Sequence, residues 1–146
     1  MPWIRSLLRL TSEDRSLLLA ATLWLGAARL GLWLLPLRVI RRLLARATRS
    51  TRRPLAVPAS PARIAWAIAV AGRFVPRATC LPQALATEAL LVQNRYSPQV
   101  RIGVVKAGPG RLLAHAWVEC DGHVIVGDLR DLARYASLPP LPGATP

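Results

Sequence analysis

The residues best suited to chemistry are a cysteine near the middle of the chain and a histidine in its last third. Cys80 stands in ATCLPQALATEALL, where Thr79 is suited to cap a helix and Pro82 fits only its first turn. The positive end of a helix dipole and its free N–H groups favour a thiolate and can stabilise an oxyanion. We therefore predict that Cys80 is a nucleophile and that Gln83, one turn along, donates to the oxyanion.

The candidate histidine lies in LAHAWVECDGHVIVGD, whose Asp121-Gly122 dipeptide predicts the two-residue loop of a β-hairpin. Antiparallel pairing with a constant register then places His115 directly opposite Asp128, on the same face as Trp117. A carboxylate beside an imidazole fixes its tautomer and supports its positive form. We predict that His115 is the general base and acid, that Asp128 orients it and that Trp117 lines the substrate-binding site. A purely structural cross-strand pair is the alternative. Asp121 is needed for the turn and is too close in sequence to fold back on His115.

The remaining cysteine and histidine carry no such signal. Cys120 flanks the turn and points away from the face of His115, so we interpret it as a small buried apolar residue. His123 is expected to be an exposed residue at a strand end. The two cysteines form no disulfide framework, and the spacing of Cys and His does not suit zinc. We expect neither a metal nor another cofactor.

Helices are expected first and a sheet late in the chain, which predicts an α+β fold. Thr11 or Ser12 begins an apolar helix, Pro36 breaks it, and Ser60 with Pro61 begins another that ends near Gly72 to Pro76. A strand is predicted over 99–105, followed by a turn at 108–110. The proline-rich stretch PLAVPASP, residues 54–61, is typical of a linker. We therefore divide the chain into an N-terminal helical segment, 1–55, and a second domain, 56–146.

The N-terminal segment is both apolar and basic. Its longest uncharged run, Leu17–Ala28, is shorter than the roughly 20 residues of a membrane span. The apolar part is a buried core helix or, alternatively, a surface for a hydrophobic partner or the membrane interface. The charge run is interpreted as a solvated helix face, and without interleaved aromatics or a DNA-binding motif it does not favour nucleic acid. Its arginines are Arg38, Arg41, Arg42, Arg46, Arg49, Arg52 and Arg53.

Composition sets wider limits on partners and location. The chain has 146 residues, 53% of them apolar, and a formal net charge of +13. The apolar share allows a sizeable core, and the charge implies attraction to an acidic protein, peptide or membrane surface. Glu13 and Asp14 precede the apolar run and no small-residue cleavage site closes it, so the start does not have the pattern of a signal peptide. We expect a cytoplasmic protein, with peripheral membrane attachment as an alternative.

The order of these motifs resembles a known family. Cys in ATCLPQALA, His in AHAWVE and then DGHVIVGD are similar to the transglutaminase-like cysteine peptidases of lasso-peptide maturation, over about residues 64–135. The resemblance implies a papain-like core in which the helix that starts at the Cys packs on a small antiparallel sheet. It also implies a Cys80–His115–Asp128 triad that removes the leader peptide from a ribosomally made precursor.

The resemblance implies partners as well. Such peptidases occur fused to a leader-binding domain or separately, and no strand-rich start precedes the helices here. The family pattern therefore implies a separate peptidase that works with a stand-alone leader-recognition protein, and an ATP-dependent cyclase as a further partner. Residues 1–55 are the candidate docking surface. Two alternatives remain open: a transglutaminase-like acyltransferase, and a non-catalytic basic binding module.

Overall fold

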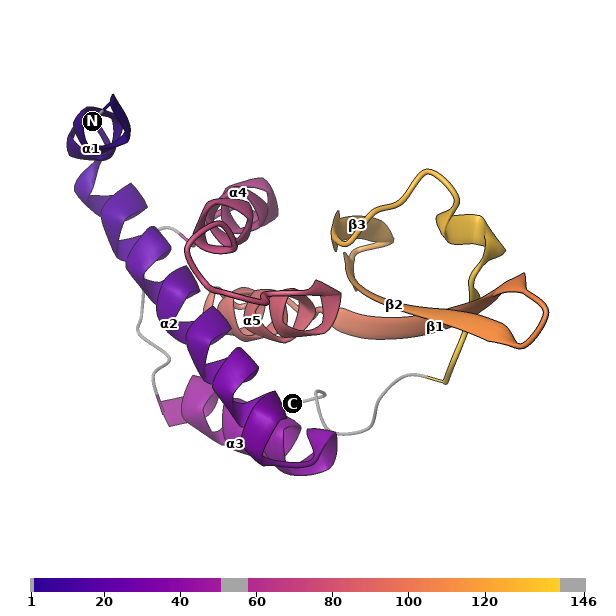
Figure 1. The fold of residues 1–146 in the computed structure, drawn as a ribbon. Coiled ribbons are helices and arrows are strands. Elements are labelled where there is room, and N and C mark those ends of the chain that lie inside the picture. Colours follow the sequence, from indigo (N-terminus) through magenta and orange to yellow (C-terminus); the bar gives the residue numbers. More distant parts are fainter. Residues whose placement is uncertain (1, 51–57, 140–146) are drawn as a thin grey trace.

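The computed structural model describes residues 2–50 and 58–139, whose elements are arranged as in Figure 1. Three helices come first: α1 (Pro2–Leu8), α2 (Ser12–Leu34) and α3 (Leu37–Ser50). The predicted start of α2 is confirmed, because Thr11 Oγ1 accepts the N–H of Asp14 at 3.2 Å. Pro36 lies between α2 and α3, where its ring ends one helix and favours the first turn of the next.

Two more helices follow, α4 (Pro61–Ala71) and α5 (Cys80–Gln93). Ser60 caps α4 as predicted, with its Oγ 3.3 Å from the backbone nitrogen of Arg63, and Pro61 takes the first helical position. Residues 51–57 lie outside the described part of the chain. Half of the predicted linker, residues 54–57, falls there, and Pro61 at its end already belongs to α4. The predicted boundary between residues 55 and 56 also lies outside the described residues, so it stays a prediction.

The C-terminal part is a four-stranded antiparallel sheet with strand order β3-β2-β1-β4. Both predicted turns are confirmed, and Asp121 and Gly122 have φ of 51° and 79°, as a tight hairpin loop requires. The short β4 and the single 3₁₀ turn at Leu132–Arg134 were not predicted. The strands are β1 (Gln99–Gly108), β2 (Arg111–Cys120), β3 (His123–Val126) and β4 (Ala136–Ser137).

The register between β2 and β3 differs from the constant register that the sequence predicted. Beside the turn, Cys120 pairs with His123 and Glu119 with Val124, as a two-residue loop requires. The register then shifts, so that Val118 pairs with Val126, and β3 ends there. One extra residue in β3, Ile125, is the mark of a β-bulge. The prediction that His115 lies directly opposite Asp128 is therefore wrong.

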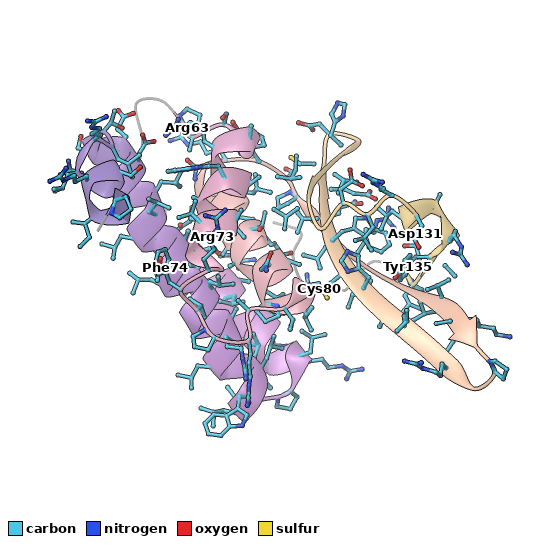
Figure 2. All side chains as sticks on the ribbon, turned by 45° about the horizontal axis from the view of Figure 1, so that its top comes forward. Arg63, Arg73, Phe74, Cys80, Asp131 and Tyr135 are labelled. Atoms are coloured by element: carbon cyan, nitrogen blue, oxygen red, sulfur yellow. The ribbon has the colours of Figure 1, made fainter. Side chains whose placement is uncertain are left out.

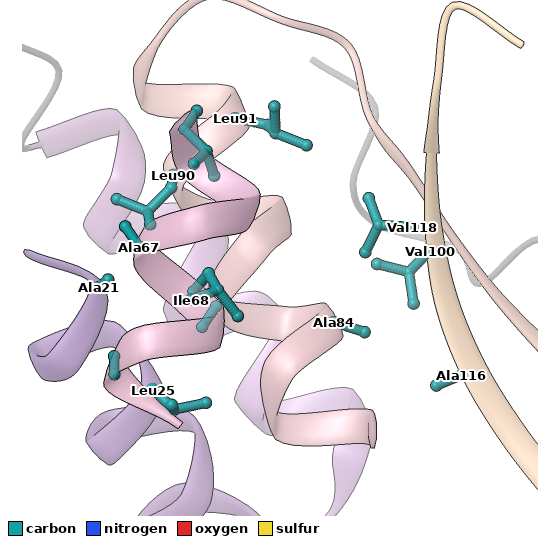
Figure 3. Close-up of a cluster of buried hydrophobic side chains, with 13 residues drawn as sticks. Ala21, Leu25, Ala67, Ile68, Ala84, Leu90, Leu91, Val100, Ala116 and Val118 are labelled. Atoms are coloured by element: carbon teal, nitrogen blue, oxygen red, sulfur yellow. The ribbon is translucent and has the colours of Figure 1, made fainter. Parts of the chain in front are cut away.

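The core lies between the helices and one face of the sheet. Val100, Ala116 and Val118 point from the sheet toward α5, where Ala84 and Leu91 meet them (Figure 3). Because side chains alternate along a strand, the residues between them point to the opposite face. The α+β prediction is confirmed, with α5 packed on the sheet as a papain-like core requires.

The N-terminal helices share this core. Ala21 and Leu25 of α2 are fully buried in the same cluster as the sheet residues, and Trp24 Nε1 donates to Gln93 Oε1 of α5 at 3.0 Å. Figure 1 shows α5 between α2 and the sheet. The interpretation of the whole charge run as a solvated helix face is wrong for Arg41. This side chain is buried against Glu88 of α5, and its Nη2 lies 3.1 Å from Glu88 Oε1.

Candidate active site

Cys80 occupies the first position of α5, as predicted. Thr79 is the N-cap residue, and the N–H of Gln83 donates to its carbonyl at 3.2 Å. Helix geometry leaves the first N–H groups without partners inside the helix, and Pro82 has none to offer. The backbone donors beside the sulfur are therefore those of Cys80 and Leu81, the pair that an oxyanion at this helix end can use.

The sheet-facing side of α5 carries the thiol toward β2. Cys80 is a half-buried free cysteine that packs against the core cluster. It lies one helical turn before Ala84, which faces Ala116 in Figure 3, while Leu91 lies near Val118 further along. Cys80 therefore lies on the side of α5 that packs on β2. Figure 2 shows Cys80 at the end of α5 nearest the sheet.

The His115 ring is oriented by a backbone carbonyl. Its Nε2 lies 2.6 Å from the carbonyl oxygen of Gly127. A carbonyl can only accept, so Nε2 carries the proton and Nδ1 keeps the lone pair. The tautomer needed for a general base at Nδ1 is therefore fixed, and Gly127 supplies the orientation that we predicted for Asp128.

A glycine is required where this carbonyl approaches β2. Gly127 has φ of 88°, which L side chains rarely adopt. A Cβ at this position would lie 2.7 Å from the Ala116 carbonyl oxygen and 2.9 Å from Trp117 Cα. The close approach brings Gly127 within reach of the His115 ring, and it is a consequence of the bulge.

Two aromatic residues enclose the ring. Trp117 stacks on it with centroids 6.3 Å apart and an interplanar angle of 17°, and Tyr135 lies at 5.9 Å and 56°. Trp117 is itself held by Glu119, since its Nε1 donates to Oε1 at 2.8 Å. Gly103, paired with His115 across β1 and β2, leaves room for both residues, because a Cβ there would lie 2.9 Å from the Trp117 ring and 2.9 Å from Tyr135 Cβ.

The other predicted site residues stand further from this arrangement. Asp128 is exposed. In the described part of the chain, the His115 ring bonds to the carbonyl of Gly127 and not to the carboxylate of Asp128. Gln83 donates through Nε2 to the Ala78 carbonyl at 2.7 Å, which ties the loop before Cys80 to the first turn of α5. Their catalytic roles stay predictions.

The structure thus brings His115, Trp117 and Tyr135 together, and puts Cys80 at the start of α5, the helix that packs on the other face of the sheet. Within residues 2–50 and 58–139, no hydrogen bond joins Cys80 to His115. His115 shares the sheet face opposite the one that α5 covers, so a Cys80–His115 pair requires the sulfur and the ring to meet at the edge of β2 that β3 leaves open beyond Val126. Sequence reasoning missed Tyr135 and Gly127. The only local signal for Gly127 was a glycine directly after a predicted strand, and Tyr135 had none.

The second cysteine and the second histidine have the structural roles expected of them. Cys120 is buried, and burial together with the nearby Asp121 carboxylate raises the pKa of its thiol above the ordinary value. His123 is exposed at the start of β3. In the described segments no group of three His, Cys, Asp or Glu residues is placed to hold a metal ion.

Comparison with known proteins agrees with this fold and site. The sequence model of the Transglutaminase-like superfamily matches residues 22–139, so the chain belongs to that superfamily. Membership supports an activity of the cysteine peptidase or acyltransferase type. No curated protein and no solved structure matches the chain significantly.

Proposed function

We propose that this protein is a cysteine peptidase that removes the leader peptide from a lasso-peptide precursor, with a separate leader-recognition protein as its partner. The observation that carries the proposal is the orientation of His115, whose Nδ1 is left as a base by the bond from Nε2 to Gly127, together with a cysteine at a helix N-terminus. The choice of leader peptidase rests on the resemblance of ATCLPQALA, AHAWVE and DGHVIVGD to that family.

The reaction begins with proton transfer from the Cys80 thiol to His115 Nδ1. The thiolate attacks the carbonyl carbon at the leader–core junction, and the oxyanion accepts the N–H groups of Cys80 and Leu81. The C–N bond breaks as His115 returns the proton to the leaving amine of the core peptide. Water then attacks the thioester, gives a proton to His115, and releases the leader as a free acid with the thiol restored.

The charge of the chain supports a peptide partner. The formal net charge is +13, which attracts acidic segments of a precursor or of a recognition protein. An ATP-dependent cyclase, which would use the released core, is the further partner that the resemblance implies. We expect a cytoplasmic location for this assembly.

The proposal is tested by cleavage of the precursor in the presence of its recognition protein, followed by mass spectrometry. Cys80→Ala and His115→Ala should abolish release of the leader, and Cys120→Ala should cleave like the wild type because that thiol is buried. Cleavage that persists in Cys80→Ala would contradict the proposal. An inactive wild type with its partner present would instead support a binding module.

Acyl transfer is the second candidate, because the superfamily includes both reaction types. The two differ in whether water or an amine attacks the thioester. Added primary amine should leave the leader product as a free acid if the protein is a peptidase. A product heavier by the mass of the amine less water would identify an acyltransferase.

A further inference from the structure

The outer face of α2 is an exposed apolar stripe. Leu19, Leu23 and Leu30 are 62%, 65% and 55% exposed, and Trp33 and Leu34 beyond them are 72% and 62% exposed. Their spacings of three, four and seven place all five on one side of the helix. Such a stripe is unusual on a free surface and marks a face that meets another apolar phase.

The opposite side of the same helix is part of the protein core. Ala21, Leu25 and Ala28 are fully buried against the core, and Asp14 at the helix start forms an ion pair with Arg63 of α4. With 23 residues α2 is long and apolar enough to cross a membrane. Crossing would pull these three side chains out of the core, so the helix is placed to lie on a membrane and not to span it.

Apart from Glu13 and the ion-paired Asp14 at the start of α2, the charged residues along the stripe and on α3 are all arginines. No aspartate or glutamate occurs between Asp14 and Glu88, a stretch that contains α3, α4 and nearly all of α2. Exposed arginines stand on both sides of the stripe in sequence: Arg9 and Arg15 before it, and Arg38, Arg42, Arg46 and Arg49 on α3 after it. Apolar side chains flanked along the chain by exposed cations complement an anionic lipid surface.

We propose that the outer face of α2 binds the surface of an anionic membrane, with the helix lying parallel to the plane of the lipid. A single convex helix face inserts between headgroups without needing a groove, and Trp33 suits the interface between headgroups and acyl chains. The sheet lies on the far side of α5 from α2 (Figure 1), so the candidate active site stays open to solvent when the protein is bound. This inference does not depend on the proposed function.

The test is flotation of the full chain with phosphatidylcholine vesicles, with and without phosphatidylglycerol. The wild type should float with the anionic vesicles, less so at high salt, and remain below with phosphatidylcholine alone. The variant Leu23→Gln/Leu30→Gln/Trp33→Gln should lose about tenfold in bound fraction. Leu112→Gln is the matched control, because Leu112 on the β1–β2 hairpin is exposed to 65%, as Leu23 is, and lies outside α2.

Trp33→Phe adds a measurement that does not depend on the triple variant. Brominated acyl chains in anionic vesicles should quench the tryptophan fluorescence of the wild type, and most of that quenching should disappear in Trp33→Phe. A wild type that stays with the aqueous phase would overturn the proposal and leave the stripe to a protein partner. Equal loss of flotation in Leu112→Gln, or unchanged flotation in the triple variant, would overturn it as well.

Discussion

At the scale of the residue, the proposed chemistry depends on one histidine whose ring is held by a carbonyl. The 2.6 Å contact of His115 Nε2 with the Gly127 oxygen fixes the tautomer without a charged partner. A carboxylate would also stabilise the positive ring that forms when the thiol is deprotonated. Asp128 is one residue away from this contact and exposed, so any such help from it acts through solvent and is weak.

Asp128→Ala is therefore expected to be much milder than His115→Ala. We predict a loss in kcat/KM below ~10-fold for Asp128→Ala and of ~100-fold or more for His115→Ala, the range typical of a general base. Precursor cleavage with the recognition protein present measures both. Equal losses in the two variants would show that the carboxylate, and not the carbonyl, orients the ring during the reaction.

At the scale of the element, the bulge in β3 decides what faces His115. It shifts the register by one residue, so that Asp128 is no longer opposite His115, and the ring bonds the Gly127 carbonyl instead. The close packing of Gly127 on Ala116 maintains this geometry. Substitutions at Gly127 should therefore change stability and activity together.

Gly127→Ala should destabilise the fold by about 2–4 kcal/mol, because it adds backbone strain and a steric clash with β2. Gly122→Ala is the control: its φ is also positive, at 79°, but nothing lies within 4 Å of the added Cβ. Strain alone should cost it about 1 kcal/mol. Urea denaturation measures both, and an equal cost would show that the close approach of Gly127 to β2 is not needed.

The buried Arg41–Glu88 ion pair between α3 and α5 should make the stability of the fold depend on pH. Burial raises the pKa of Glu88 above its ordinary value of 4.5, and Arg41 offsets that increase only in part. The native state then holds the proton more tightly than the unfolded chain does, so this contribution to stability is present below pH 4.5 and is lost as the pH rises through the native pKa.

Glu88→Gln removes this titration and keeps an amide oxygen that can accept from Arg41. The free energy of unfolding of the wild type, relative to that of Glu88→Gln, should decrease as the pH rises from about 4 toward 7. Urea titrations of both proteins at several pH values measure the difference. A difference in the free energy of unfolding, wild type minus Glu88→Gln, that increases with pH would contradict this prediction.

At the scale of the whole molecule, the sequence predicted what neighbouring residues decide. Thr11 and Ser60 mark helix starts because side-chain capping is local, and Asp121-Gly122 marks the hairpin turn for the same reason. Thr79 is also the N-cap residue of its helix, although its side chain makes no capping hydrogen bond. The order of helices and strands followed from these signals, and so did the α+β class.

The rest depends on tertiary contacts that no local pattern contains. The bulge at Ile125 forms where the chain turns to pack Gly127 on β2, and β4 has only two residues. Tyr135 reaches His115 from a segment without regular structure, and Arg41 is buried only because Glu88 lies opposite. The predicted triad was therefore correct in placing Cys80 at a helix start and wrong in its constant register.

The most direct test of the central claim, that the Cys80 thiol and the His115 ring act as a pair, is the alkylation rate of Cys80. In a Cys120→Ala background, iodoacetamide labelling at about pH 7 is followed by mass spectrometry of the peptide that contains Cys80. If Nδ1 of His115 takes the proton of the thiol, His115→Ala should slow labelling by ~10-fold or more. Equal rates with and without the imidazole would contradict the pairing.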